Sequence, residues 1–275
     1  MSKTKKPPRV FAQPEDLVQT KSQLRERSLS VIGIGVGNPD YLTVQALAAL
    51  DKSDVFFIPD KGQEKQDLAK MRETICERFI QGRNYRTVGY KIPPRLNQGD
   101  YKTGVQAWHA EIAGIFEHLL LDELGPNEHG AFLVWGDPSL YDSTLRLLQT
   151  VSERGKVKLT YDVIPGITAA QALTAAHQTT LNAIGEPVTI TTGRALAANP
   201  NPANATLVML DGQTAFQHLP PDTHIYWGAY LGTPDEILIA GKIKDVAEQI
   251  QARRAAARAA KGWIMDTYLV RKEDE

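Results

Sequence analysis

The sequence has very little cysteine: Cys76 is the one cysteine among 275 residues. A single thiol cannot form an internal disulfide or a cysteine cage for zinc, so disulfide-stapled scaffolds and zinc modules are excluded. Cys76 lies in the stretch Ile75-Cys76-Glu77-Arg78-Phe79, which has helical periodicity. We interpret it as a small core residue and not as a nucleophile.

Long hydrophobic runs and an excess of one charge are also lacking. No apolar run approaches the ~18 residues that a membrane helix needs. The basic N-terminus, residues 1–9, leads into no hydrophobic stretch, so we do not expect it to act as a secretory signal. The 31 Lys plus Arg against 32 Asp plus Glu give a net charge of −1, which argues against a dedicated nucleic-acid binder. We therefore expect a soluble cytoplasmic protein with no membrane and no nucleic-acid partner.

Hydrophobic residues make up 42% of the chain, enough for a substantial core, and they fall into alternating strand-like and helix-like segments. A buried strand is predicted over 28–35, a helix over 43–50 with Thr43 as its N-cap, and a second buried strand over 55–58. Strand, helix and strand within about 30 residues form a βαβ unit, which implies a parallel sheet.

The same alternation continues along the chain. Further helices are predicted over 108–121, 141–153, 169–176 and 245–260, and further strands over 131–135, 159–164, 188–192, 206–210 and 224–230. The basic residues of the last helix, Arg253, Arg254, Arg258 and Lys261, are interpreted as a solvated face. Because 153–156 is short and polar, we divide the chain there into an extension (1–28) with one helical turn, an N-terminal α/β domain (29–154) and a C-terminal α/β domain (155–275).

Four loops fall at the carboxyl ends of predicted parallel strands, over 35–40, 59–62, 136–139 and 165–168. Ligands bind at this edge of open α/β sheets. The first loop has glycine at 33, 35 and 37 but Asn38 where a dinucleotide-binding Gly-x-Gly-x-x-Gly needs its third glycine, so a nicotinamide enzyme is disfavoured.

Three motifs in register carry a family resemblance. Residues 31–43 (VIGIGVGNPDYLT), 135–141 (WGDPSLY) and 163–170 (VIPGITAA) resemble the N-terminal signature, the Gly-Asp-Pro motif and the Pro-Gly-Ile motif of the tetrapyrrole methyltransferases that use S-adenosylmethionine. The resemblance implies two α/β domains with the active site in the cleft between them, in a homodimer. It implies cofactor contacts at Trp135, Gly136, Asp137, Leu140, Thr168, Ala169, Asp211 and Ala229.

One further stretch is similar to a branch of this family that also removes an acyl group. It comprises 54–62 (DVFFIPDKG), then Lys65, Asp67 and Leu68, and later Tyr101 and Trp108-His109. The reaction implied is methylation at C-1 of precorrin-5, with release of the acetyl group as acetate. Two alternatives stay open: a methyltransferase that acts at another precorrin position, and a catalytically silent tetrapyrrole-binding homologue.

Loss of the acetyl group requires a base. Asp60 is the first candidate, because a carboxylate at the carboxyl tip of a strand faces the cleft. Lys61 is a candidate to stabilise developing negative charge, and His109 is the second candidate base. The remaining histidines show no ligand spacing, so no metal site is predicted.

Local charge agrees with a polycarboxylate substrate. Residues 61–102 contain ten Lys plus Arg against five Asp plus Glu, an excess of five positive charges. Candidates to meet the substrate carboxylates are Arg83, Arg86, Lys91, Arg95 and Lys102.

The first loop departs from the family pattern, since Val36 and Asn38 stand where the family has proline and aspartate. We expect a looser loop and the loss of a capping contact there. This departure keeps the silent alternative open.

Overall fold

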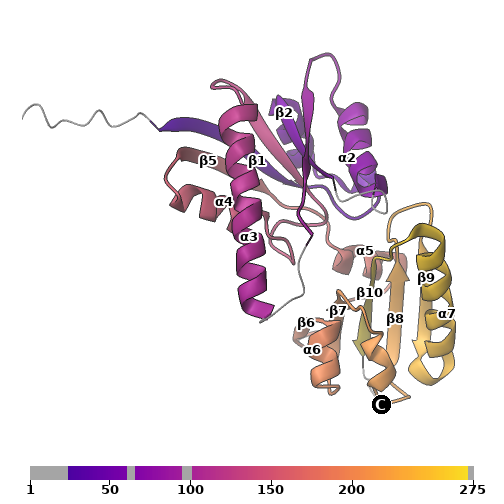
Figure 1. Cartoon of the computed structure of the whole chain (residues 1–275). Coiled ribbons are helices and arrows are strands. Elements are labelled where there is room, and N and C mark those ends of the chain that lie inside the picture. Colours follow the sequence, from indigo (N-terminus) through magenta and orange to yellow (C-terminus); the bar gives the residue numbers. More distant parts are fainter. Residues whose placement is uncertain (1–23, 61–65, 95–100, 272–275) are drawn as a thin grey trace, which may run out of the picture.

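The computed structural model describes residues 24–60, 66–94 and 101–271. These residues form two lobes, each built on a five-stranded sheet with helices against it (Figure 1). A helical turn was expected within residues 1–28, of which 1–23 lie outside the described residues. The first strand begins at Arg25 and not at Ser28, so the end of the expected extension belongs to this strand.

The first sheet is entirely parallel, as the βαβ pattern predicts. In spatial order its strands are β3 (Arg86–Lys91), β2 (Val55–Asp60), β4 (His129–Val134), β1 (Arg25–Gly33) and β5 (Val157–Ile164). The predicted division at 154 and 155 does not coincide with the division between sheets. β5 pairs with β1 from Arg25 opposite Val157 to Ile32 opposite Ile164, so the first sheet extends to residue 164.

Alternating strand residues explain why helices cover both faces of this sheet. Leu29 and Val31 of β1 face α3 (Tyr101–His118) and α4 (Thr144–Glu153). Ile32 faces α1 (Val44–Lys52) and α2 (Gln66–Phe79) on the other side. Helix α1 begins as predicted, since the Thr43 side chain accepts a hydrogen bond from the amide of Ala46. A π-helical turn, Leu119–Glu123, extends α3.

Cys76 belongs to the core between α2 and the sheet. It is fully buried, and burial raises the pKa of its thiol to about 12. A thiol that stays protonated is not a nucleophile. The core interpretation is therefore confirmed.

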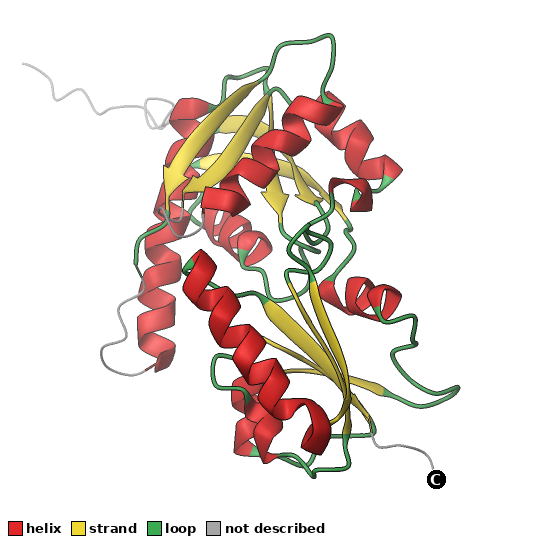
Figure 2. Ribbon diagram, turned by 90° about the vertical axis from the view of Figure 1, so that its right-hand side faces the viewer, coloured by secondary structure: helices red, strands yellow, loops and turns green. Residues whose placement is uncertain are grey.

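The second sheet is mixed. In spatial order it contains β6 (Val188–Thr192), β7 (Ala205–Met209), β10 (Asp266–Arg271), β8 (His224–Ala229) and β9 (Ile237–Lys242). The helices α6 (Gly193–Ala198) and α7 (Ile243–Lys261) contribute to the core on one face, and α5 (Ala169–Ala176) contributes to the core on the other. The short loop 165–168 connects the last strand of the first sheet, β5, to α5 of the second lobe, and Figure 2 shows loops gathered between the two lobes.

Candidate functional site

Three glycine-bearing loops meet at the carboxyl ends of β1, β4 and β5. Gly35 and Gly136 exchange two backbone hydrogen bonds, of 3.2 and 2.9 Å. A Cβ atom on Gly166 would lie 2.1 Å from the carbonyl oxygen of Gly136 and 2.8 Å from the backbone of Gly33. Only glycine allows the loops to approach this closely. The three motifs therefore form one continuous structure.

Asp137 ties two of these loops together. One carboxylate oxygen accepts the amide of Ser139 at 2.8 Å, and the other accepts the amide of Gly166 at 2.8 Å. Burial opposes ionisation of Asp137, but the hydrogen bonds from Ser139 and Gly166 outweigh it and lower the pKa of the carboxyl group. With both oxygens engaged in this way, Asp137 holds the loops in place.

The third loop ends in the N-terminus of α5. The Thr168 hydroxyl accepts a hydrogen bond from the amide of Ala170 at 3.1 Å, and the Gln171 side chain accepts the amide of Thr168 at 3.1 Å. This capping box fixes the direction in which the first turn leaves the loop.

A cavity of about 310 Å³ lies where these loops face the second sheet. Six of the eight predicted cofactor residues line it: Trp135, Gly136, Asp137, Leu140, Thr168 and Ala169. The opposite wall comes from the second lobe and includes Met209, Leu210, Tyr230, Leu231, Trp263, Met265 and Asp266. We refer to this space as the interlobe cavity. Residues from both α/β units therefore form its walls.

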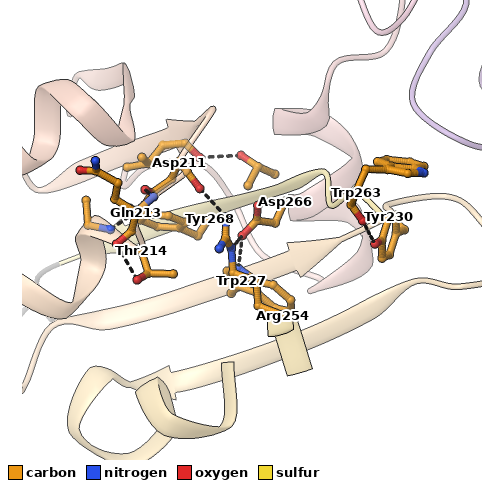
Figure 3. Close-up of polar contacts among 12 residues, drawn as sticks. Asp211, Gln213, Thr214, Trp227, Tyr230, Arg254, Trp263, Asp266 and Tyr268 are labelled. Atoms are coloured by element: carbon orange, nitrogen blue, oxygen red, sulfur yellow. Dashed lines mark hydrogen bonds and ion pairs between the residues drawn. The ribbon is translucent and has the colours of Figure 1, made fainter. Parts of the chain in front are cut away.

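The other two predicted cofactor residues do not line the interlobe cavity. Asp211 is buried, and its carboxylate accepts hydrogen bonds from the amides of Gln213 and Ala215 and from the Tyr268 hydroxyl (Figure 3). Ala229 is fully buried in β8. Both residues stabilise the second lobe beneath the cavity wall.

Sequence reasoning missed a buried carboxylate that does line the interlobe cavity, Asp266. It accepts hydrogen bonds of 3.0 Å from the Trp227 indole and from Arg254 (Figure 3). Burial raises the pKa of Asp266, although Arg254 and Trp227 partly oppose the rise. The expectation that Arg254 belongs to a solvated face is wrong, because its side chain is 12% exposed and pairs with Asp266.

Backbone strain is concentrated at the same cavity. Tyr141, Leu210 and Tyr230 have φ angles of 52°, 53° and 50°, in the left-handed region that bulky residues rarely adopt. All three line the interlobe cavity. Such strain persists only where surrounding structure imposes it, and it clusters at functional sites. No sequence pattern signals it.

The first loop reaches the second lobe as well. Val36 lines the interlobe cavity, and a Cβ atom on Gly37 would lie 2.2 Å from the carbonyl oxygen of Leu231. The predicted loss of a capping contact is wrong. The Asn38 side chain accepts the amide of Asp40 at 2.9 Å and caps a short helical turn, as a carboxylate would.

The candidate bases Asp60 and His109 lie beside a second cavity and not beside the interlobe cavity. Asp60 is exposed at the carboxyl end of β2, and its neighbour Pro59 lines a second cavity, of about 380 Å³. His109 is half-buried on α3 with its ring 5.3 Å from that of Trp108, which also lines the second cavity. Lys61 lies outside the described residues. Neither Asp60 nor His109 lines the interlobe cavity.

Two of the predicted carboxylate-binding arginines lie at the amino ends of the strands, away from the carboxyl ends where the cavities lie. Arg83 is held by Asp51 and Asp54 at the amino end of β2, and Arg86 pairs with Glu128 at 2.7 Å. Lys91, at the carboxyl end of β3, stays a candidate. Arg95 and the side chain of Lys102 lie outside the described part of the structure.

Two further properties concern the described residues alone. No three His, Cys, Asp or Glu side chains among them come together in a group that could hold a metal ion. No helix in this part of the chain is both long and apolar enough to cross a membrane.

Residues 28–247 match the family model of the tetrapyrrole (corrin/porphyrin) methylases. The chain belongs to this family. It is 53% identical over 249 residues to a precorrin-6A synthase [deacetylating] of a Sinorhizobium species, covering 90% of this chain and 95% of that protein. A precorrin-2 C(20)-methyltransferase from a Sinorhizobium species is 29% identical over 140 residues, covering 50% of this chain and 53% of that protein.

Solved structures of tetrapyrrole methylases share the fold. A cobalamin synthesis related protein (CobF) of Corynebacterium diphtheriae superimposes with a TM-score of 0.78 and 37% identity, covering 90% of this chain and all of that one. A uroporphyrin-III-C-methyltransferase of Thermus thermophilus does so with a TM-score of 0.59 and 19% identity, covering 89% and 94%. The two α/β units and their family were thus predicted correctly.

Proposed function

We propose that this chain is an S-adenosylmethionine-dependent C-methyltransferase of corrin biosynthesis. It methylates C-1 of precorrin-5 and releases acetate, which gives precorrin-6A. One observation carries the proposal: the three motif loops meet at one cavity, in a chain 53% identical to a precorrin-6A synthase along 95% of that protein.

The interlobe cavity fits the methyl donor. Trp135 and Trp263 line it, and the indole N–H of each is buried without a hydrogen-bond partner among the described residues. Buried donors of this kind are satisfied when a ligand brings acceptors. The donor carries no phosphate, so a mostly apolar wall with exposed backbone groups suits it. We propose contacts at Trp135, Gly136, Leu140, Thr168 and Ala169, with Asp137 as the residue that positions their loops.

When bound, the donor supplies a methyl group on a sulfonium. The chain's own residues supply alignment and exclude water, the two main demands of a displacement at carbon. The loops around Gly136 and Gly166 fix the floor of the cavity, and the strained residues Tyr141, Leu210 and Tyr230 fix its rim. Because these protein groups are in place before the substrate arrives, the site needs no reorganisation during the reaction.

The test is a reaction of the purified protein with precorrin-5 and methyl-labelled S-adenosylmethionine. We expect one labelled methyl group at C-1, located by NMR, and one acetate per methyl group. Label at another carbon would support a different methyltransferase of the family. Binding of the donor without any transfer would support the silent tetrapyrrole-binding homologue.

A homodimer is part of the proposal, supported by one face of the second sheet. Cross-strand pairing places Ile190, Leu207, Leu269, Tyr226 and Ala240 in one row on the α5 side of this sheet. At the edges of this face Ile190 and Leu238 are 43% and 37% exposed. Leu207 and Leu269 at the centre of this row are fully buried, and the exposed apolar side chains at its edges suit a partner subunit. Light scattering should give twice the mass of one chain; a monomer would contradict this.

The cytoplasmic location stays a prediction.

A further inference from the structure

The second cavity adjoins the interlobe cavity. It lies on the α3 and α4 side of the first sheet, near the carboxyl ends of β2, β3 and β4. Its walls present polar and apolar surface in nearly equal parts, and they include the aromatic side chains of Phe57, Tyr90, Trp108, Phe116 and Phe132. Arg72 and Asp142 line both cavities, so they form the boundary between them.

Arg72 is a buried cation without a carboxylate partner. The residue is 6% exposed, its Nε donates to the carbonyl of Leu133 at 2.9 Å, and one terminal nitrogen donates to the carbonyl of Leu68 at 2.7 Å. No carboxylate among the described residues forms an ion pair with it. Burial lowers the pKa of Arg72, and Tyr90 and the charge of Asp142 oppose this fall only in part. Buried charges in proteins are normally paired, so the missing anion is expected from a ligand.

Asp142 stands at the same boundary in a fixed position. One carboxylate oxygen accepts the amide of Thr144 at 2.7 Å at the start of α4. The preceding residue, Tyr141, has a left-handed backbone, and this turns the chain between the two cavities. The boundary therefore carries one cation that can hold an anion and one carboxylate that can accept a proton.

We propose that the second cavity is an acyl pocket, in which Arg72 binds the oxygen of the substrate's acetyl group and of the departing acetate while Asp142 accepts the proton of the attacking water. This inference rests on the proposed function. A carbon that loses an acetyl group and gains a methyl group must reach both an acyl site and a methyl donor. Two cavities with a common wall provide both at one position.

The step is a hydrolysis of a carbon–carbon bond. Water attacks the acetyl carbonyl and gives one proton to Asp142, and the negative charge on the carbonyl oxygen faces Arg72. The bond from C-1 to the acetyl carbon then breaks, its electron pair stays on the ring system at C-1, and acetic acid loses a second proton. That pair forms the bond to the methyl group, whose sulfonium becomes a neutral thioether. One water is consumed, and one acetate and two protons are released.

The kinetic test uses Arg72→Met, Arg72→Lys and Asp142→Asn at saturating methyl donor, with acetate and methyl transfer measured together. Arg72→Met should lower kcat for both by about 100-fold or more with KM changed little, because the contact is made to charge in the transition state. Arg72→Lys should recover part of this loss. Asp142→Asn should lower kcat for both acetate release and methyl transfer.

The matched control is Arg78→Met, on the same helix, where the arginine is exposed and pairs with Asp40. It should leave kcat unchanged. A rise in KM with unchanged kcat in Arg72→Met would overturn the proposal, because it would make Arg72 an anchor for a peripheral carboxylate.

A binding measurement separates this inference from the proposed function. Titration of ¹³C-labelled acetate into the protein saturated with S-adenosylhomocysteine, followed by NMR, should show saturable binding in the wild type. Binding should be lost in Arg72→Met and retained in Arg78→Met. If acetate binding depends on Arg72 but precorrin-5 is not turned over, the acyl pocket is supported and the proposed function is contradicted. If Arg72→Met turns over precorrin-5 at the full rate, the proposed function is supported and the acyl pocket is contradicted.

Discussion

Gly166 has no room for a side chain, because the nearest atoms to a Cβ there are backbone atoms of Gly136 and Gly33. Gly166→Ala should therefore push the motif loops apart. We expect a loss of about 1–3 kcal/mol in the free energy of unfolding, as is typical of overpacking, together with weaker binding of S-adenosylmethionine. Chemical denaturation and calorimetric titration measure the two effects.

Gly89→Ala is the matched control. Gly89 lies on the edge strand β3, and a Cβ atom there would meet nothing within 4 Å. Its stability and donor affinity should stay close to those of the wild type. Equal effects of the two substitutions would contradict the close packing of the loops.

His129 should make stability depend on pH. Burial, followed by the positive charge of Lys52, lowers the pKa of this side chain, which forms hydrogen bonds with Ser28 and Ser30. The unfolded chain therefore takes up the proton more readily than the fold does. Stability from His129 is complete above the ordinary histidine pKa of about 6.5 and is lost as the pH falls through the lowered value.

The measurement is the free energy of unfolding between pH 7.5 and pH 5, in steps of roughly half a unit around the ordinary histidine pKa. His129→Gln should reduce the fall in stability on acidification, whatever it costs at neutral pH. An unchanged slope in His129→Gln would show that other groups cause the pH dependence.

At the scale of elements, two threonine N-caps can be compared. Thr168 caps α5 and lines the interlobe cavity, whereas Thr43 caps α1 and does not line it. Replacement of either by alanine should cost about 1 kcal/mol of stability. Thr168→Ala alone should also weaken donor binding, by about 0.5–1.5 kcal/mol, the usual contribution of one hydrogen bond. Donor binding that weakens equally in Thr43→Ala would contradict a local role for α5.

The sequence predicts those helices and strands whose own residues show a clear hydrophobic pattern. The strand at 188–192 and the helix at 169–176 were predicted with the bounds found in the structure. Strand β3 was missed because it is an exposed edge strand of mostly polar residues. Strands β9 and β10 were missed because their apolar runs, Ile237–Ala240 and Tyr268–Val270, are too short for periodicity to assign them to a strand.

At the scale of the whole molecule, strand pairing decided what local patterns could not. The polar segment 153–156 resembles a domain junction, but β5 follows it and returns to the first sheet beside β1. Pairing between strands more than a hundred residues apart has no local signature. The last strand, β10, lies at the centre of the second sheet, and this position likewise depends on pairing that no local pattern indicates.

The candidate site shows the same limit. The wall of the interlobe cavity that follows β4 and β5 was predictable, because the carboxyl ends of parallel strands meet at one edge. The wall from the second lobe, with Tyr230, Trp263 and Asp266, depends on how the lobes pack. Asp211 was predicted by its register in a motif, but its carboxylate is occupied within the second lobe.

The most direct test of the central claim is calorimetric titration of the purified protein with S-adenosylmethionine and with S-adenosylhomocysteine. We predict one site per chain with a dissociation constant on the order of 1 μM for each ligand. Ala169→Leu, which places a larger side chain into the interlobe cavity, should weaken both by at least about tenfold, or 1.4 kcal/mol. Absence of binding by both ligands, or binding that Ala169→Leu leaves unchanged, would contradict a methyl-donor site between the two lobes.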